Sequence, residues 1–402
     1  MSLPARPQLI AVFATVILLT TASIALAQHD PSGITGGGMI GGSTGRPATK
    51  PATKPATKPA TTTTTTPRKK PTTPTTTVKK PTTNSSADAY YQQGETLYNA
   101  QKYREALDLY LKAAEINPSM ATALYRIGWI YNDLEDYEAA VDPLRRVTAL
   151  QSNNAAANFE LGYAYRKLER YAEAIATFNQ TIRIKPDYAA AHYELGWINN
   201  EQKNYDDAVR NLKLAISYRS NYPEARNELG YALRNLGRYS ESIEEYQEAI
   251  RLKPDMGLAH LGLGDVYYYN TKQYAEAVKS YKRGLELRPG NAVAQYNLGW
   301  CYNDMERYGE AAEELRKAVQ IRPNYPEAHN ELGYALHQLG RYGEAVQQYQ
   351  IAIQQKVDYA SAHYNLGMSF IALRNRPGAL EQYRILQRID SARATKLFNN
   401  MK

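Results

Sequence analysis

The residues best suited to binding chemistry are aromatic rings interleaved with amides and guanidiniums at helical spacing. The same three-residue pattern occurs in six segments. It begins with an aromatic residue or asparagine, has tryptophan or tyrosine four residues later, and has asparagine, arginine or histidine three residues after that. These spacings put all three side chains on one face of a helix. We call this set the aromatic stripe: Tyr125, Trp129, Asn132; Phe159, Tyr163, Arg166; Tyr193, Trp197, Asn200; Asn227, Tyr231, Arg234; Tyr296, Trp300, Asn303; Asn330, Tyr334, His337. Such rings beside hydrogen-bonding groups are typical of recognition surfaces, and packing between helices is the alternative role.

Residues with catalytic or metal-binding spacing are not evident. Four histidines, at 192, 260, 329 and 363, share one place in a repeating pattern, and His329 with His337 lacks the one-turn spacing of a metal pair. Gly262 and Gly264 lie in a helical pattern rather than in a phosphate loop after a strand. Cys301 is the only cysteine, and its apolar neighbours indicate a small buried thiol. We expect no enzymatic activity, no cofactor and no metal.

The stripe lies on helices that pair into hairpins, as the segment 223–256 illustrates. Its first half carries Leu229, Leu233 and Leu236 on the face opposite the stripe. A short turn follows Gly237, a second helical pattern begins, and Pro254 ends it. The pattern predicts two antiparallel helices with one apolar face each.

This hairpin recurs with a period of 34 residues, and we number the places of each unit from its first residue. Glycine fills the eighth place of every unit: Gly94, Gly128, Gly162, Gly196, Gly230, Gly264, Gly299, Gly333 and Gly367. Leucine precedes seven of these glycines, alanine or serine fills the twentieth place of the regular units, and tyrosine fills the seventeenth place in seven of them. In the sixth unit Tyr274 and Ala277 fall one place later. The sixth unit has one extra residue before Tyr274. We expect the glycine to face the small residue so that the two helices approach closely.

These glycines, small residues and leucines, all in phase, resemble the tetratricopeptide repeat family. The resemblance covers about three quarters of the chain and implies an all-α, right-handed superhelical solenoid of nine helical hairpins. The expected units are 87–120, 121–154, 155–188, 189–222, 223–256, 257–291, 292–325, 326–359 and 360–391. Residues 392–402 form an amphipathic pattern that predicts a capping helix.

The resemblance also suggests what the aromatic stripe does. In this family the corresponding face lines the inner groove of the superhelix and receives protein or peptide segments. One subclass holds acidic chaperone tails with a lysine and asparagine clamp in the first units. This chain has Tyr91, Glu95 and Tyr98 at the matching places and no lysine, so that partner is not expected.

The first 86 residues differ in composition from the repeats. Residues 1–27 have Arg6, an apolar run over 9–19 and Ala25-Leu26-Ala27, which is typical of a cleaved signal peptide. The run is too short for a membrane-spanning helix, so an uncleaved anchor is the weaker alternative. Export to the periplasm, the cell surface or the medium is therefore expected. Residues 28–86, first glycine-rich and then rich in threonine, proline and lysine, predict a disordered spacer, with Ser85 and Ser86 capping a first helix that opens at Ala87.

The charge is unevenly distributed along the chain. The net charge is +8, but residues 28–86 hold nine lysines and arginines against Asp30, and 87–402 carries −1. The basic spacer could hold an anionic cell-envelope surface, whereas nucleic-acid binding conflicts with export and with nearly neutral repeats. The leading interpretation is an exported scaffold for protein or peptide partners. The alternative is a structural protein that forms homo-oligomers through its tyrosine-rich repeat surface.

Overall fold

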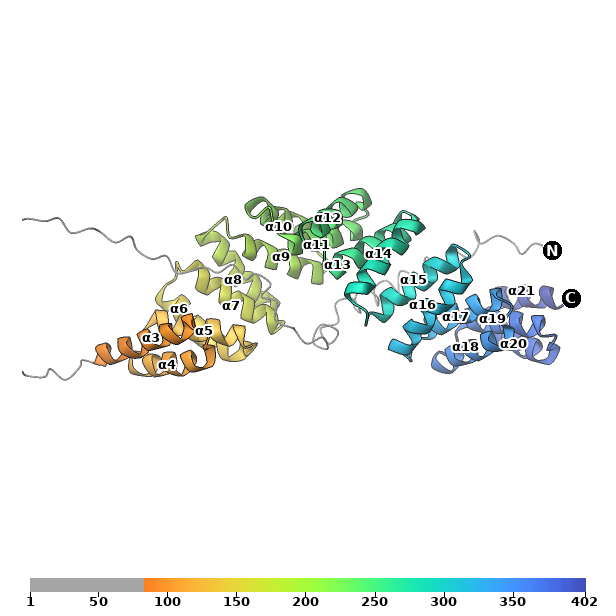
Figure 1. The fold of residues 1–402 in the computed structure, drawn as a ribbon, viewed down its shortest axis with the longest axis horizontal. Coiled ribbons are helices and arrows are strands. Elements are labelled where there is room, and N and C mark those ends of the chain that lie inside the picture. Colours follow the sequence, from red (N-terminus) through yellow and green to blue (C-terminus); the bar gives the residue numbers. More distant parts are fainter. Residues whose placement is uncertain (1–82) are drawn as a thin grey trace, which may run out of the picture. The chain divides into compact units, whose positions relative to one another are not determined.

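The structure, a computed structural model, describes residues 83–402, which form helices alone (Figure 1). The first helices of nine hairpins are α3 (Thr83–Asn99), α5 (Ala121–Asp133), α7 (Ala155–Lys167), α9 (Ala189–Glu201), α11 (Pro223–Asn235), α13 (Gly257–Asp265) continued by the π-helical turn η2 (Val266–Asn270), α15 (Ala292–Asp304), α17 (Pro326–Gln338) and α19 (Ala360–Ala372). The second helices are α4 (Tyr103–Ile116), α6 (Tyr137–Leu150), α8 (Tyr171–Ile184), α10 (Tyr205–Tyr218), α12 (Tyr239–Leu252), α14 (Tyr274–Leu287), α16 (Tyr308–Ile321), α18 (Tyr342–Gln355) and α20 (Arg376–Ile389), and α21 (Ser391–Met401) closes the chain. The predicted all-α solenoid of nine hairpins and a capping helix is confirmed.

Each first helix ends in a turn built around the fifteenth place of its unit. In the fifth unit the Arg238 amide donates to the Leu233 carbonyl at 2.9 Å, and Gly237 between them has φ +76°. This is the Schellman ending of a helix. Non-glycine residues adopt the same positive φ in seven units: Gln101, Glu135, Glu169, Lys203, Lys272, Glu306 and Arg374. The turn brings the seventeenth-place tyrosine to the start of the second helix.

The eighth-place glycine faces the expected small residue across the hairpin and also accommodates a large side chain that was not expected. A Cβ at Gly299 would lie 2.5 Å from Leu315 Cγ, and one at Gly333 would lie 2.7 Å from the ring of Tyr349. Leu315 and Tyr349 occupy the twenty-fourth place, and Tyr, Leu or Phe fills that place in the other units. The small twentieth-place residue packs beside the glycine backbone; in the fifth unit Ser242 Oγ donates to the Gly230 carbonyl at 2.7 Å.

The core of each hairpin is built by the predicted apolar faces. Leu229 and Leu233 are each 1% exposed, and the leucine before each glycine is buried in every unit that has one. Burial of such side chains supplies most of the stability of a helical pair. The leucine face predicted from the sequence is therefore confirmed as the buried face.

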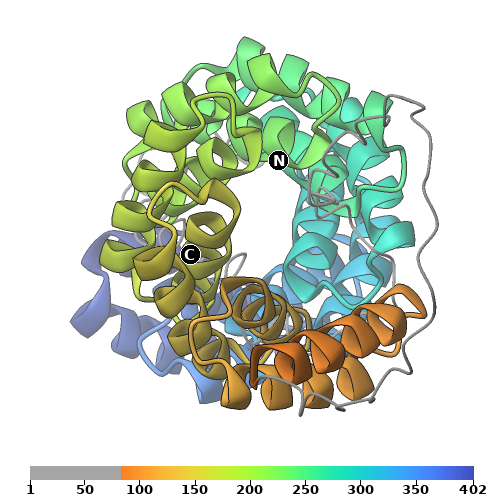
Figure 2. The same cartoon turned by 90° about the vertical axis from the view of Figure 1, so that its left-hand side faces the viewer.

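Successive hairpins stack so that each second helix contacts the first helix of the next unit. First helices also contact first helices, for example α5 with α7 and α15 with α17, whereas no comparable contact joins successive second helices in the described part of the chain. The first helices therefore lie on the inner, concave side of the curve. Figure 2 shows the hairpins following one another around a common axis.

The extra residue of the sixth unit is absorbed within its first helix. The helix loosens into η2, and the Gln273 amide bonds to the Tyr267 carbonyl, six residues back, at 2.8 Å. A π-helical turn is the usual result of inserting one residue into an α-helix. The following turn and α14 consequently remain in phase with the other units.

The two ends of the described region differ in how well they match expectation. Helix α3 begins at Thr83, so Ser85 and Ser86 lie inside the helix and do not cap it; the expectation of a start at Ala87 was wrong. The sequence has no proline between Pro81 and the first repeat, so no residue there prevents the helix from starting before Ala87.

At the C-terminal end, α21 places the fully buried Leu397 against Gly367 and thereby caps the last hairpin. The expected signal peptide, and the expected spacer up to residue 82, lie outside the described residues.

Candidate functional site

The ninth place of the first helices carries the most accessible rings of the aromatic stripe. Trp129, Tyr163, Trp197, Tyr231, Trp300 and Tyr334 are all half-buried and lie on the concave side. At the fifth place Tyr125 and Tyr193 are also half-buried, but Phe159 and Tyr296 are 4% and 6% exposed. The ninth place, rather than the fifth, therefore offers ring surface throughout the stripe.

Five of the six ninth-place rings, all except Trp300, contact the turn tyrosine of the preceding unit. Tyr137 contacts Tyr163 with ring centroids 6.2 Å apart, and Tyr308 contacts Tyr334 at 6.1 Å, both nearly edge-on. The same pairing joins Tyr103 to Trp129, Tyr171 to Trp197 and Tyr205 to Tyr231. Edge-on contacts are favourable for aromatic pairs. The stripe thus has a packing role between units as well as an accessible surface.

The fifth-place rings of three units pack on the tyrosine at the end of the same unit. Tyr193 contacts Tyr222 and Tyr296 contacts Tyr325, each with centroids 5.0 Å apart. Phe159 stacks on Tyr188 at the same distance. Burial raises the pKa of Tyr193 and Tyr296 well above the ordinary value of tyrosine, so both phenols are neutral hydrogen-bond donors.

The asparagines at the twelfth place join one unit to the next. The Nδ2 atom of Asn132 donates to both the carbonyl oxygen and Oε2 of Glu160, each at 2.9 Å. Asn200 makes the same pair of bonds to Glu228, and Asn303 makes them to Glu331. Asn132, Asn200 and Asn303 are 3%, 2% and 0% exposed, so these side chains fix the spacing between first helices.

Arginine and histidine at the twelfth place make equivalent links. Arg166 pairs with Glu194 at 2.5 Å, and Arg234 Nη1 pairs with Asp265 Oδ2 at 2.7 Å. His337 Nδ1 lies 2.8 Å from Ser369 Oγ, and burial lowers the pKa of His337, which favours the neutral ring. Asn227 and Asn330 at the fifth place each contact a glutamate of their own helix. Partner binding by all these residues stays a prediction.

The sixth unit contributes aromatic residues that the sequence pattern missed. Its places five and nine hold Leu261 and Asp265, but η2 brings Tyr268 and Tyr269 to Trp300, with ring centroids 5.7 and 6.1 Å away. Tyr268 is 2% exposed and its hydroxyl donates to Asp304 Oδ2 at 2.6 Å. The run of three tyrosines and the inserted residue were the available signal.

The Asp265 carboxylate accepts hydrogen bonds from three different side chains. It is 3% exposed and accepts hydrogen bonds from Arg234 of the fifth unit, from the Tyr281 hydroxyl at 2.7 Å and from Asn297 of the seventh unit at 3.3 Å. A buried carboxylate is tolerated when it is paired and hydrogen-bonded in this way. Asp265 therefore ties three consecutive units together beside η2.

The fourth-place histidines bond to backbone. Their Nε2 atoms lie 2.9–3.1 Å from the carbonyl oxygens of Pro186, Pro254, Pro323 and Val357, six residues earlier. Cys301 is fully buried, and burial raises the pKa of its thiol to about 12. In residues 83–402 no group of three or more histidine, cysteine, aspartate or glutamate side chains is placed to hold a metal ion. No helix in the same range is long and apolar enough to span a membrane.

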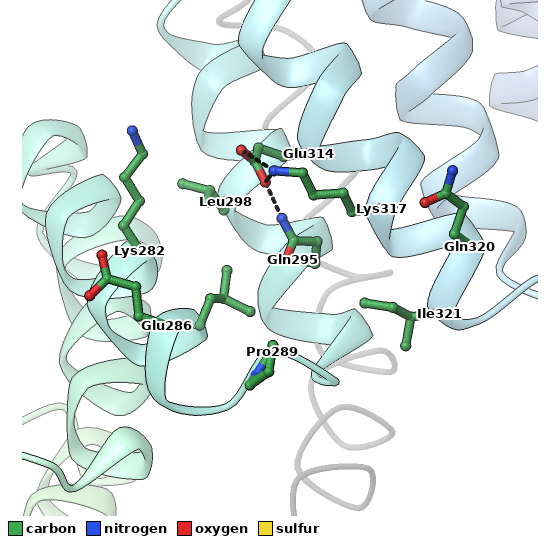
Figure 3. Close-up of a pocket in the computed structure, with 10 residues that line it drawn as sticks. Lys282, Glu286, Pro289, Gln295, Leu298, Glu314, Lys317, Gln320 and Ile321 are labelled. Atoms are coloured by element: carbon green, nitrogen blue, oxygen red, sulfur yellow. Dashed lines mark hydrogen bonds and ion pairs between the residues drawn. The ribbon is translucent and has the colours of Figure 1, made fainter.

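Two surface cavities lie outside the aromatic stripe. The larger, about 500 Å³, lies between α14, α15 and α16 and is shown in Figure 3. Three of its polar side chains already bind one another, because Gln295 and Lys317 both contact Glu314. The other, about 480 Å³, lies beside the paired Arg251 and Glu248. Neither brings together groups that suggest a reaction.

The described region is thus a helical-repeat solenoid whose inner face carries aromatic rings. Sequence profiles described as tetratricopeptide repeat match residues 91–155, 133–189, 159–223, 201–257 and 227–292, and a TPR repeat profile matches 300–340 and 333–372. The chain belongs to the tetratricopeptide repeat family. Proteins of this family are typically non-catalytic interaction scaffolds, and the repeats of this chain form a protein-interaction scaffold.

Solved structures with the same fold share little sequence with this chain. YrrB, described as a TPR protein with an unusual peptide-binding site, is 24% identical over 47% of this chain and 97% of its own, with a TM-score of 0.44. The C-terminal part of a TPR protein from Cytophaga hutchinsonii is 16% identical over 60% and 99%, with a TM-score of 0.49. Pseudomonas aeruginosa pilF is 20% identical over 53% and 97%, with a TM-score of 0.46. A comparison with curated proteins gave no match.

Proposed function

We propose that this protein is an exported, non-catalytic scaffold that binds extended protein or peptide segments along the concave face of its repeats. The observation that carries the proposal is the series of half-buried ninth-place rings on the first helices. Rigid aromatic side chains provide large contact area at little entropic cost, and they dominate binding when they lie at the centre of an interface. The turn tyrosines behind them hold the rings in fixed orientations.

The residues of the aromatic stripe divide into two roles under this proposal. The rings of Trp129, Trp197 and Trp300 contact the partner, together with the tyrosines at 125, 163, 193, 231 and 334. The side chains of the twelfth place, of which the three asparagines are buried, hold neighbouring first helices at a constant distance, so that the rings present a regular series. Tyr296, which is nearly buried, supports Trp300 at a centroid distance of 5.6 Å.

The double variant Trp197→Ala/Trp300→Ala tests the proposal. Ligands are first selected on the full chain from a displayed library of random peptides, and affinities are then measured by fluorescence polarisation. Central aromatic anchors commonly contribute about 2 kcal/mol each, or about thirtyfold in affinity per ring, so we expect the double variant to bind roughly several hundredfold more weakly. Leu214→Ala, which truncates a 41% exposed side chain on α10, is the matched control and should leave binding unchanged.

Thermal melting of the same variants separates binding from packing. Because both indoles are half-buried, we expect a smaller loss of stability than the roughly 3–5 kcal/mol typical of truncating a fully buried aromatic residue. A double variant that melts many degrees lower and loses binding only in proportion to its unfolding would assign the rings to packing alone.

Export is proposed from the sequence of residues 1–27. The basic residue, the apolar run and the small residues before Gln28 support a cleaved signal peptide, and the basic spacer that follows supports contact with an anionic envelope surface. N-terminal sequencing of the mature protein should find Gln28 first. A mature chain that begins at Met1 or Ser2 and stays in the cytosolic fraction would overturn this part.

Self-assembly is the second candidate function. Large apolar side chains outside the concave face favour it, for example Leu150, 50% exposed, and Val357, 71% exposed. They are scattered singly, which is usual for a protein surface and gives weaker support than a continuous patch. Sedimentation velocity decides: a concentration-dependent oligomer would support assembly, and a monomer over the accessible range would exclude it.

A further inference from the structure

Negative charge is concentrated on the helices that line the concave side. The first helices of the nine units carry twelve aspartates and glutamates against five lysines and arginines, a net charge of −7. Residues 87–402 as a whole carry −1, so the second helices, the turns and α21 together carry +6. This partition favours a cationic ligand on the inner face.

Each tryptophan of the chain has a carboxylate one helical turn after it. The pairs are Trp129 with Asp133, Trp197 with Glu201, and Trp300 with Asp304. Residues four apart are neighbours on one helix face. Asp133 is exposed, and Glu201 and Asp304 are half-buried.

A tyrosine of the preceding unit completes each pair. Tyr98 contacts Trp129 at 5.4 Å between centroids, Tyr171 contacts Trp197 at 6.4 Å, and Tyr268 contacts Trp300 at 5.7 Å. The Tyr268 hydroxyl also donates to Asp304 Oδ2 at 2.6 Å, so Tyr268 contacts both the Trp300 ring and the Asp304 carboxylate.

In each of the three groups, the charge of the carboxylate affects the tyrosine that contacts the tryptophan. The pKa of Tyr98, Tyr171 and Tyr268 is raised, mainly by burial. The charges of Asp133, Glu201 and Asp304, respectively, add to the effect. Each tyrosine therefore lies close to both members of its pair.

The chain itself already places a cation at each of these groups. The Arg126 guanidinium lies 4.1 Å from the Tyr98 ring centroid, and Lys272 Nζ lies 5.8 Å from the Tyr268 ring centroid. The Arg166 guanidinium lies over the Trp197 ring, 4.7 Å from the centroid, while it pairs with Glu194. A guanidinium over an indole face with a carboxylate beside it is a favourable arrangement. Arg166 lies over the indole itself, whereas Arg126 and Lys272 lie over the tyrosines of the other two groups. The indoles of Trp129 and Trp300 are therefore the better-placed subsites for a ligand.

We infer that the three Trp-Tyr-carboxylate groups are subsites for lysine or arginine side chains of an extended partner segment. The inference rests on the proposed function and names the chemistry of its ligand. A segment is favoured over a compact partner because the groups lie on three separate helices, α5, α9 and α15. The cation is held over the indole, and the carboxylate neutralises its charge.

The test compares labelled peptides of equal length on the full chain and its variants. The probes are repeated Lys-Ala-Pro, Gln-Ala-Pro and Glu-Ala-Pro units, in which proline keeps the chain extended. The triple variant Asp133→Asn/Glu201→Gln/Asp304→Asn removes the three charges with little change of shape. The control Glu115→Gln/Glu276→Gln/Glu313→Gln removes three exposed charges from the second helices α4, α14 and α16.

We expect only the lysine peptide to bind tightly, with affinity that falls as salt is added. The triple variant should bind it about tenfold or more weakly, whereas the control should match the wild type. Equal weakening in both variants would mean unspecific attraction and would overturn the inference. Equal binding of the lysine and glutamine peptides, lost in Trp197→Ala/Trp300→Ala but kept in the triple variant, would also overturn it and leave the groove proposal standing.

Discussion

The absence of one methyl group at the eighth place determines how closely the two helices of each hairpin approach. In the seventh unit an added Cβ at Gly299 would meet Leu315 at 2.5 Å and the backbone oxygen of Ala311 at 3.3 Å. Neither atom belongs to the free end of a flexible side chain. Any residue larger than glycine must therefore separate α15 from α16.

We predict that Gly299→Ala destabilises the protein although alanine is the better helix former. Overpacking should cost about 1–3 kcal/mol, more than the roughly 0.5–1 kcal/mol that alanine contributes in a helix. Gly309→Ala is the control, because this helical glycine of the same unit has no neighbouring atom within 4 Å of its Cβ position. Urea unfolding of both variants measures the difference. A Gly299→Ala protein as stable as Gly309→Ala would show that the close contact does not exist.

The contacts between units explain what the sequence could and could not predict at the scale of helices. The leucine face, the turns and the capping helix follow from periodicity within one unit, and all three were predicted. The bond from Asn132 to Glu160 spans 28 residues. It depends on how one hairpin stacks on the next, which periodicity within a unit does not specify. The position of η2 was missed for a similar reason: an insertion can be counted in the sequence, but packing decides where it is absorbed.

Helix α21 should matter mainly to the unit it covers. Leu397 is fully buried against Gly367, whereas the neighbouring Phe398 is 40% exposed. We predict that Leu397→Ala costs about 2–5 kcal/mol and that the loss appears in α19 and α20, because a solenoid transmits stability through nearest neighbours. Hydrogen exchange followed by mass spectrometry should show faster exchange there and unchanged exchange in α11 and α12. Phe398→Ala is the control; uniform loss of protection in Leu397→Ala would contradict the local effect.

At the scale of the whole molecule, one surface combines the features that matter for binding. The concave side carries the ninth-place rings, the excess of carboxylates and all three tryptophans of the chain. The sequence predicted the rings through their spacing and the family resemblance. It did not show that the twelfth-place side chains bond to the next unit and that the asparagines among them are buried, since both depend on the stacking of neighbouring first helices.

The measurement that tests this account most directly is acrylamide quenching of tryptophan fluorescence, with and without a bound peptide. Trp129, Trp197 and Trp300 are the only tryptophans, so the whole signal comes from the proposed surface. Calorimetry under the same conditions establishes saturation by a peptide selected on the full chain. The account predicts that the half-buried indoles are quenched in the free protein and become markedly less accessible when the peptide is bound. Unchanged quenching at saturation would place the binding site elsewhere on the molecule and contradict the central claim.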